Sequence, residues 1–274
     1  MKHYEIKDDF TTIVEEYKSF NDFVNVQNER PAVWVNPEND GKLYREVKGR
    51  RDWHQCESFE EAQEYLIHGY EQNVNQMVAK VGVLQKHGTR TKTQRYVDCV
   101  GYAPIVPNAI LGLPNSMMNS KKKAIKSKVV TILYCPEVSW SVSSQEVLDF
   151  GCKFMNCVMN LEKNGYRVRI DFVNVFTTAS DGKRQYILRI PVKNENNPIN
   201  IKRLSFPLTN AGMQRFLCFD WFEHLPNSRY IQSLGAPLNK STQSEKKNFN
   251  KLLKDNEYLI TYGDDVEQIF SQIK

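Results

Sequence analysis

The stretch "TILYCPEVSWSVSSQEVLDFG", residues 131–151, decides the fold that this sequence predicts. Its first residues, up to Cys135, form a short apolar run of the kind found in buried strands. The serine-rich segment that follows ends at Ser143 and Ser144, and serine side chains commonly accept hydrogen bonds from the free N–H groups that begin a helix. A buried strand followed directly by a helix indicates an α/β sheet.

The same alternation of strands and helices continues to the C-terminus. Strands are expected at residues 129–135, 168–175, 186–192, 229–234 and 258–261, and helices at 144–163, 211–223, 242–254 and 264–273. The dipeptide Asp181-Gly182 is a hairpin signal between the second and third strands, whereas the other connections contain helices and imply parallel pairing. Residues 121–274 are therefore predicted to form an α/β domain, a mostly parallel sheet with one antiparallel hairpin.

Residues 1–120 are predicted to be a mainly helical N-terminal region. A short amphipathic helix is expected around residues 10–20, where the apolar residues have helical spacing. The segment "SFEEAQEYLIHGYEQNVNQMVAKVGVLQKHG", residues 58–88, predicts a longer helix capped by Ser58 and Glu61, in which Gly69 or Gly82 could mark a break. The proline- and glycine-punctuated residues 95–128 predict a connection between the two halves.

Four stretches carry a resemblance to an uncharacterised family of tailed-bacteriophage proteins. They are "SFEEAQEYLIHGYEQ" (58–72), "GYAPIVPNAILGLPNSM" (101–117), "VLDFGCKFMNCVMNLEKNGYRVRIDF" (147–172) and "INIKRLSFPLTNAGMQRFLCFDWFE" (199–223). The order of the predicted elements also resembles the von Willebrand factor A-like, Rossmannoid α/β fold. The resemblance implies a phage or prophage origin, and hence a location in the host cytoplasm or the virion, but it brings no activity or cofactor with it.

The von Willebrand factor A-like fold carries a metal site where its first strand ends in Asp-x-Ser-x-Ser. The residues in that slot here are Cys135, Glu137 and Ser139. A hard divalent cation prefers carboxylate and hydroxyl oxygens, and sulfur is a soft ligand. We therefore expect no bound metal and a degenerate site whose loops contact a macromolecular partner instead. The residues predicted for this contact are Glu137, Ser139, Trp140, Ser141, Thr209, Asn239 and Asp264.

Trp140 leaves two alternatives open. It either packs against the edge of the sheet, since tryptophan is usually highly buried, or it is an exposed anchor for the partner, since tryptophan is enriched among interface hot spots. We favour the anchor.

Catalytic motifs are absent from the sequence. It contains neither G-x-x-x-x-G-K-[ST] nor G-x-G-x-x-G, the patterns that hold nucleotide phosphates. None of the five histidines stands in a recognisable catalytic context, and His224 ends an aromatic helix where interaction with the helix dipole is expected. We expect no catalytic residues and no cofactor, and we favour a non-enzymatic protein.

The composition sets further limits on where the chain works. With 41% hydrophobic and 25% charged residues it has the make-up of a soluble globular protein. No run approaches the roughly 18 apolar residues of a membrane span, and "MKHYEIKDDF" has no apolar signal-peptide core. We therefore predict a protein that is neither secreted nor membrane-spanning, with no membrane partner. The six cysteines form no C-x-x-C pair and are expected to be reduced.

Three basic segments suggest a nucleic-acid partner as an alternative, and the net charge of +5 permits one. If the segments share a face, they suit a phosphate backbone, and the nearby aromatics Tyr44, Trp53 and Tyr96 could stack on bases. The residues concerned are Lys48, Arg50, Arg51, Lys86, Arg90, Lys92, Arg95, Lys121, Lys122 and Lys123.

Three hypotheses for function follow from the sequence. The leading one is a non-enzymatic phage protein that binds a macromolecular partner, a phage or host protein, through the Trp140 face. The second is a phage protein that binds DNA or RNA through its basic segments. The third is an enzyme with a dispersed site at the C-terminal edge of the sheet, formed by Glu137, Asn239, Asp264 and Asp265. The sequence leaves the oligomeric state open.

Overall fold

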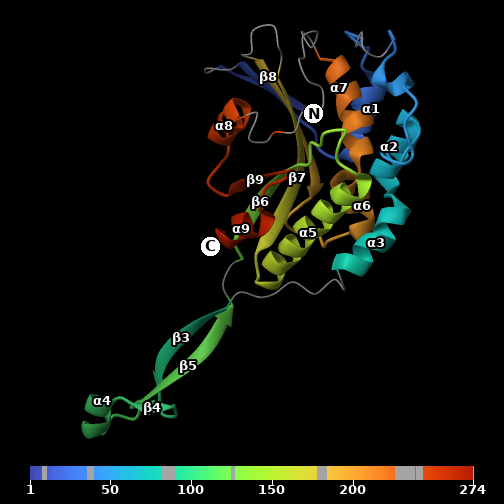
Figure 1. Ribbon diagram of the computed structural model, residues 1–274. Helices are drawn as coiled ribbons and strands as arrows, with labels where there is room; N and C mark the ends of the chain where they lie inside the picture. Colours follow the sequence, from blue (N-terminus) through green and yellow to red (C-terminus); the bar gives the residue numbers. More distant parts are fainter. Residues whose placement is uncertain are drawn as a thin grey trace.

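The computed structural model describes residues 1–7, 11–35, 40–81, 91–124, 127–177, 184–225, 238 and 243–273, and a six-stranded sheet forms its centre (Figure 1). The strands, in order across the sheet, are β1 (Lys2–Lys7), β2 (Thr11–Glu16), β8 (Arg184–Lys193), β7 (Arg167–Thr177), β6 (Val129–Cys135) and β9 (Glu257–Thr261). The β2–β8, β6–β7 and β6–β9 pairs are parallel, whereas β1–β2 and β7–β8 are antiparallel.

The predicted fold class is therefore wrong. The sheet is mixed rather than mostly parallel, and a second, wholly antiparallel sheet stands apart from it. Strands β1 and β2 form one end of the main sheet, so residues 1–120 are not a mainly helical region separate from the sheet. The predicted von Willebrand A-like domain of residues 121–274 is wrong as well, because it would lack these two strands of the sheet.

Strand β2 occupies the segment for which an amphipathic helix was expected. Its residues Thr-Thr-Ile-Val are β-branched, and such side chains are stiff and favour extended backbone. The helical spacing was misleading because it considered only the apolar residues, whereas a polar residue of this segment, Glu15, is also buried. Glu15 is buried, with hydrogen bonds from Arg30, Tyr17 and Trp221, and Val14 on the opposite face is buried as well.

The stretch at residues 131–151 forms the predicted elements. Strand β6 ends at Cys135, and α5 spans Ser144–Lys163. The Ser143 side chain accepts the Glu146 N–H at 3.3 Å, and the Glu146 carboxylate accepts the Ser143 N–H at 2.9 Å, which completes a capping box.

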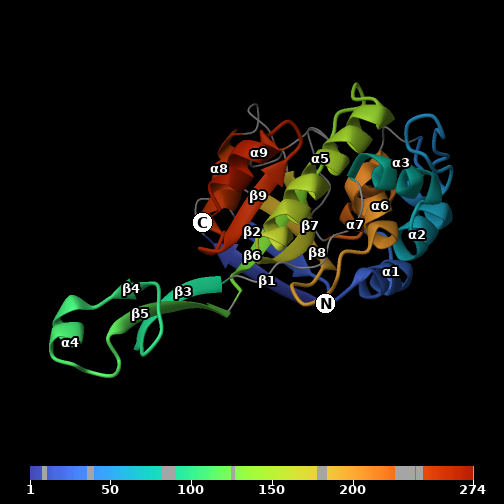
Figure 2. The same ribbon diagram turned by 90° about the horizontal axis from the view of Figure 1, so that it is seen from below.

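Helices cover the two faces of the sheet unequally (Figure 2). Along β6, Ile132 and Tyr134 enter the larger apolar cluster, whereas Leu133 and Cys135 enter a smaller one, because alternate side chains point to opposite faces. The helices on the larger side are α1 (Phe20–Glu29), α2 (Phe59–His68), α3 (Glu71–Val81), α5, α6 (Ile201–Thr209), the π-helix η3 (Met213–Cys218), α7 (Phe219–Glu223) and α9 (Val266–Ser271). Helix α8 (Gln243–Lys251) covers the smaller side. None of the described helices is long and apolar enough to cross a membrane.

The helix predicted from residue 58 is interrupted at Gly69. Its φ is +87°, and a Cβ there would lie 2.1 Å from the carbonyl oxygen of Lys202 in α6. Both the backbone conformation and the close approach require glycine. Ser58 caps α2 as predicted, since its hydroxyl accepts the Glu61 N–H at 3.2 Å.

Residues 91–124 form an arm that extends away from the main sheet in both views (Figures 1 and 2). Strand β3 (Thr91–Asp98) pairs with β5 (Met117–Ala124), and β4 (Ala103–Pro104) and the short helix α4 (Val106–Ile110) lie at the far end. The predicted connection between the halves is thus an ordered ribbon, and the expected boundary at residue 120 falls within β5. The expected strand at 229–234, the Asp181-Gly182 turn and Gly82 lie outside the described residues.

Candidate functional site

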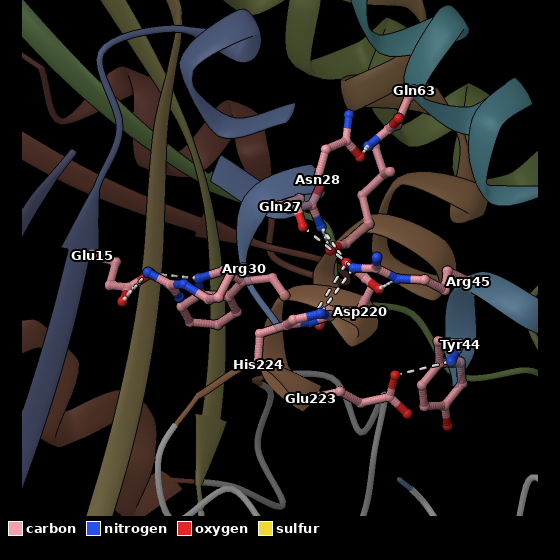
Figure 3. Close-up of polar contacts among 12 residues, drawn as sticks. Glu15, Gln27, Asn28, Arg30, Tyr44, Arg45, Gln63, Asp220, Glu223 and His224 are labelled. Atoms are coloured by element: carbon pink, nitrogen blue, oxygen red, sulfur yellow. Dashed lines mark hydrogen bonds and ion pairs between the residues drawn. The ribbon is translucent and has the colours of Figure 1, made fainter. Parts of the chain in front are cut away.

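A buried ion pair fixes the turn η2 (Tyr44–Glu46) on α7 (Figure 3). The fully buried Asp220 accepts hydrogen bonds from Arg45 Nε at 2.7 Å and from Gln27 Nε2 at 3.0 Å. Burial raises the pKa of Asp220, and the guanidinium of Arg45 opposes that change. The Tyr44 N–H donates to the Glu223 carboxylate at 2.9 Å, which adds a second attachment. The loop after η2 therefore starts from a fixed position.

His224 completes the same network. Its Nε2 lies 2.8 Å from Arg45 Nη2, and its Nδ1 lies 2.6 Å from the carbonyl oxygen of Asp220. Since a guanidinium can only donate, Nε2 accepts and the Nδ1–H donates, which is the neutral imidazole. Both ring nitrogens of His224 thus have partners within the protein, and the residue links Arg45 to α7.

A pocket of about 270 Å³ lies beside this network. Drug-sized ligands generally occupy pockets of roughly 300 Å³ or more, so this one suits a single ring with its substituent rather than a dinucleotide. Its aromatic lining residues are Tyr44, Trp53, Trp140, Phe216 and Phe219, and its basic ones are Lys48, Arg50 and Arg215. None of the described lining residues is acidic. The pocket thus combines ring faces with positive charge.

Two loops are tied together to form the pocket. The Trp53 Nε1–H donates to the carbonyl oxygen of Val142, and the Ser144 hydroxyl donates to that of Asp52 at 3.2 Å. These bonds join the loop of residues 48–57 to the segment that carries Trp140. The loop also packs closely on η3, because a Cβ at Gly49 would lie 2.6 Å from the ring of Phe216.

Arg215 brings an unpaired positive charge to the pocket. Its Cζ lies 5.0 Å from the ring centroids of both Trp53 and Phe219, and its Nη2 donates to the Val138 carbonyl at 3.0 Å. Burial lowers the pKa of Arg215, and no carboxylate of the described residues forms an ion pair with it. Its buried Nε has no hydrogen-bond partner in the described part of the chain. A partly buried cation without a counter-charge is unfavourable, so the pocket favours an anion.

His54, which also lines the pocket, and the adjacent Gln55 are held in unusual states. Burial, together with the charge of Arg215, lowers the pKa of His54 to about 4, and its Nδ1 accepts the Arg50 N–H at 2.7 Å. Gln55 has a φ of +58°, and its Oε1 accepts bonds from Asn73 and Asn210 at 3.0 and 2.9 Å. Backbone strain of this kind clusters at binding sites. The π-helix that carries Arg215 is another feature that is frequent at functional sites.

Trp140 stands at the rim of the pocket and is 81% exposed. It lies between Ser139 and Ser141, whose hydroxyls are hydrogen-bonded to each other at 3.2 Å. An exposed tryptophan on a short constrained turn differs from the usual buried one. Of the two alternatives open from the sequence, packing against the sheet edge is therefore not what the structure has.

The structure separates the other residues of the predicted partner contact. Glu137 is buried, and its carboxylate accepts the Val175 N–H at 2.5 Å. Thr209 is fully buried and accepts Asn73 Nδ2 at 2.8 Å. Asp264 forms an ion pair with Lys246 at 2.9 Å. Asn239 lies outside the described residues.

The carboxylates of the enzyme hypothesis thus have structural partners. Asp265 caps α9 by accepting the Gln268 N–H at 3.2 Å, while Asp264 also accepts the Thr261 N–H. Burial raises the pKa of Glu137 to about 8. In the described part of the chain, no group of three or more His, Cys, Asp and Glu side chains could hold a metal ion.

The predicted nucleic-acid residues fall into two places. Lys48 and Arg50 line the pocket, although the Arg50 side chain also pairs with Asp52 at 2.8 Å in solvent. Arg51 is engaged by Glu57 and Glu61. Lys92, Arg95 and Lys121–Lys123 lie on the arm, whereas Lys86 and Arg90 lie outside the described residues.

Arg215 was not predicted as a site residue, although its sequence context contains a signal. Within "AGMQRFLCFDWF", residues 211–222, Arg215 is the only basic residue of an apolar stretch. A cation in such a stretch has to be buried or paired. Arg215 lines the same pocket as Trp53 and Trp140 because two loops that are distant in the sequence fold against η3. No local sequence pattern predicts this arrangement.

Comparison with known proteins finds one family. The profile of a family described as a domain of unknown function, DUF7192, matches residues 2–274. No curated protein and no solved structure is significantly similar to the chain.

Proposed function

The chain therefore belongs to the DUF7192 family, and we propose that it is a non-enzymatic protein that binds single-stranded nucleic acid. In this proposal one nucleotide enters the Trp53–Trp140 pocket, with its base against the aromatic side chains and its phosphate on Arg215. The proposal joins the first two hypotheses from the sequence, because the exposed Trp140 and the basic Lys48 and Arg50 line the same pocket.

The observation that carries the proposal is the unpaired charge of Arg215 among aromatic rings. A nucleotide supplies the two groups that this pocket lacks, an anion for the guanidinium and a planar ring for the tryptophans. Base stacking on an aromatic side chain contributes about 1–3 kcal/mol per base, with little regard to sequence. Lys48 and Arg50 at the pocket would extend the positive surface along the strand.

A single strand fits these features better than the main competitors. In a duplex the bases are stacked on one another, and only an unpaired base can enter a pocket. A nucleotide cofactor would need a phosphate cradle, and the sequence has no such motif. An acidic peptide that carries an aromatic residue is the competitor with the most similar chemistry.

The same proposal retains the phage origin and a site of action in the host cytoplasm or the virion. Its support is the resemblance of the four quoted stretches to tailed-phage proteins. Single-stranded segments arise whenever phage DNA is replicated, repaired or transcribed, so such a ligand would be available there.

The direct test measures the affinity of the purified chain for a fluorescent oligothymidylate by anisotropy. Replacing Trp140 by Ala should weaken binding roughly 5- to 150-fold, the equivalent of about 1–3 kcal/mol of stacking. Arg215→Met should weaken binding as well and should reduce its salt dependence by about one phosphate contact. Circular dichroism establishes that each variant is folded.

Arg203→Met is the matched control, because Arg203 also lies over an aromatic ring, 5.5 Å from that of Phe20, away from the pocket. It should bind as the wild type does. An unchanged affinity of the Trp140→Ala protein, or equal losses in Arg203→Met and Arg215→Met, would contradict the proposal. Binding of an acidic aromatic peptide in place of the oligonucleotide would assign the pocket to a protein partner.

A further inference from the structure

One face of the arm carries a row of lysines. In the antiparallel β3–β5 pair, Lys92 is directly opposite Lys123, and Gln94 is directly opposite Lys121. Opposite residues share a face of a ribbon, as do alternate residues along each strand. Lys92, Lys121, Lys123 and Tyr96 therefore lie on the same face, and Lys121 Nζ lies 5.2 Å from the centroid of the Tyr96 ring.

These lysines have no counter-charge in the described part of the chain. Asp98 is the one acidic residue from Thr91 to Ala124, and it accepts the N–H of its neighbour Cys99 at 2.7 Å. Like charges directly opposite each other, as Lys92 and Lys123 are, destabilise a strand pair. An anionic partner along the ribbon would relieve this repulsion.

The end of the arm has the opposite character. No charged residue occurs from Cys99 to Ser120. The large apolar side chains there are exposed: Val100 by 70%, Tyr102 by 61%, Ile110 by 80% and Leu111 by 73%. An exposed apolar group of this kind marks an interaction surface. The arm thus combines a basic shaft with an uncharged apolar tip.

We propose that the arm binds double-stranded DNA, with the lysine face on the phosphates and the apolar tip as a wedge against a base step. A two-stranded β-ribbon is narrow enough to enter a DNA groove. Proteins that insert apolar side chains between base steps unstack them and bend the duplex, and the bend brings more phosphate within reach of basic residues. The arm holds both parts in one continuous element.

This site is separate from the pocket. It uses other residues and a paired rather than an unpaired nucleic acid, so failure of the single-strand proposal leaves it standing. Binding of a blunt duplex and of an oligothymidylate is therefore measured side by side for the arm variants, so that a loss confined to the duplex is assigned to the arm.

The experiment measures affinity and bending together, with a duplex that carries a donor and an acceptor dye at its two ends. The double variant Lys121→Gln/Lys123→Gln should bind more weakly, and the salt slope of log K should fall by about one for each lysine removed. The control Lys163→Gln/Lys202→Gln removes two exposed lysines from the body and should leave the slope unchanged.

The tip is tested by Ile110→Ser/Leu111→Ser. Both side chains are exposed, so the fold should be unaffected, while energy transfer between the DNA ends should drop toward the value of free DNA. The salt slope of this variant should remain that of the wild type, because no lysine is removed.

Three results would overturn the proposal. One is the absence of duplex binding at low salt, and another is an equal loss of slope in the arm and body lysine variants. The third is a different partner for the arm. This would be shown by binding to vesicles of anionic lipid that duplex DNA does not compete with, or by self-association in sedimentation that the tip variant abolishes and duplex DNA does not change.

Discussion

Glu137 should make the stability of this protein depend on pH in a direction opposite to that of most carboxylates. The side chain is buried two residues beyond the end of β6, where it accepts the Val175 N–H at 2.5 Å. Two opposing effects act on the pKa of Glu137. The loss of water on burial raises the pKa more than the hydrogen bonds donated to the carboxylate lower it. The result is a pKa of about 8 in the folded protein against 4.5 in the unfolded chain.

The sign follows from proton counting. Between pH 4.5 and about 8 the folded state holds a proton on Glu137 that the unfolded state has released. The free energy of unfolding therefore falls as pH rises through this range, and the contribution levels off above about pH 8. At about 1.36 kcal/mol per pKa unit, the difference between 4.5 and 8 corresponds to roughly 5 kcal/mol. The neighbouring Cys135 and Cys218 do not contribute, because burial raises the pKa of both thiols well above the usual value.

The assay is urea unfolding of the wild type and of Glu137→Gln across this pH range. Glutamine keeps the acceptor for the Val175 N–H but does not titrate, so the stability of the wild type relative to the variant should decline steadily as pH rises. Glu146→Gln is the control with the opposite sign, because hydrogen bonds from Ser143 lower the pKa of the exposed Glu146. A difference between wild type and Glu137→Gln that stays constant with pH would show that Glu137 is ionised in the folded protein and would refute the reasoning.

Three further predictions concern the tryptophan, the metal and a glycine. Trp140→Ala should change the free energy of unfolding by less than about 1 kcal/mol, since the side chain is 81% exposed; a loss of several kcal/mol in chemical denaturation would place it in the core. Millimolar Mg²⁺, Ca²⁺ or Mn²⁺ should leave the thermal midpoint unchanged, because Glu137 is expected to be protonated near neutral pH; a saturable rise that EDTA reverses would contradict this. Gly69→Ala should lower the free energy of unfolding by about 2–3 kcal/mol, through both the positive φ and the contact with the Lys202 carbonyl. Gly112→Ala, where φ is +68° and no atom lies within 4 Å, should lower it by about 1 kcal/mol. Equal losses in urea unfolding would rule out the contribution of the contact with Lys202.

Local sequence signals predicted those elements whose residue spacing and capping residue lie within one continuous stretch. Helix α5 has both its spacing and its cap, Ser143, within one stretch, and its bounds agree with the prediction. Strand β2 was mistaken for a helix because Glu15 is polar in the sequence but buried in the fold. Two of the three donors to Glu15 are distant in the sequence, Arg30 after α1 and Trp221 in α7, while Tyr17 follows directly after β2. A sequence pattern does not contain that information.

The pocket could be predicted only in parts for a similar reason. Trp140, Lys48 and Arg50 were identified from sequence, but for two different partners. The fold joins them by placing the loop of residues 48–57 on the π-helix η3, with Gly49 against Phe216. The arm was missed because proline and glycine predicted a connection, whereas the pairing of β3 with β5 depends on two segments on either side of it.

The pairing of β2 with β8 has a consequence for how the chain folds during synthesis. Strand β2, Thr11–Glu16, pairs in parallel with Arg184–Arg189, more than 160 residues later in the chain. Until that segment leaves the ribosome, β1 and β2 have no parallel neighbour, and contacts of such long sequence separation form slowly. A nascent chain therefore carries an open edge on β2 until Arg189 has been synthesised, and such edges pair readily with other chains. Low expression temperature or a chaperone that covers this N-terminal hairpin should raise the yield of folded protein, whereas removal of residues 1–16 should expose the edge of β8 permanently.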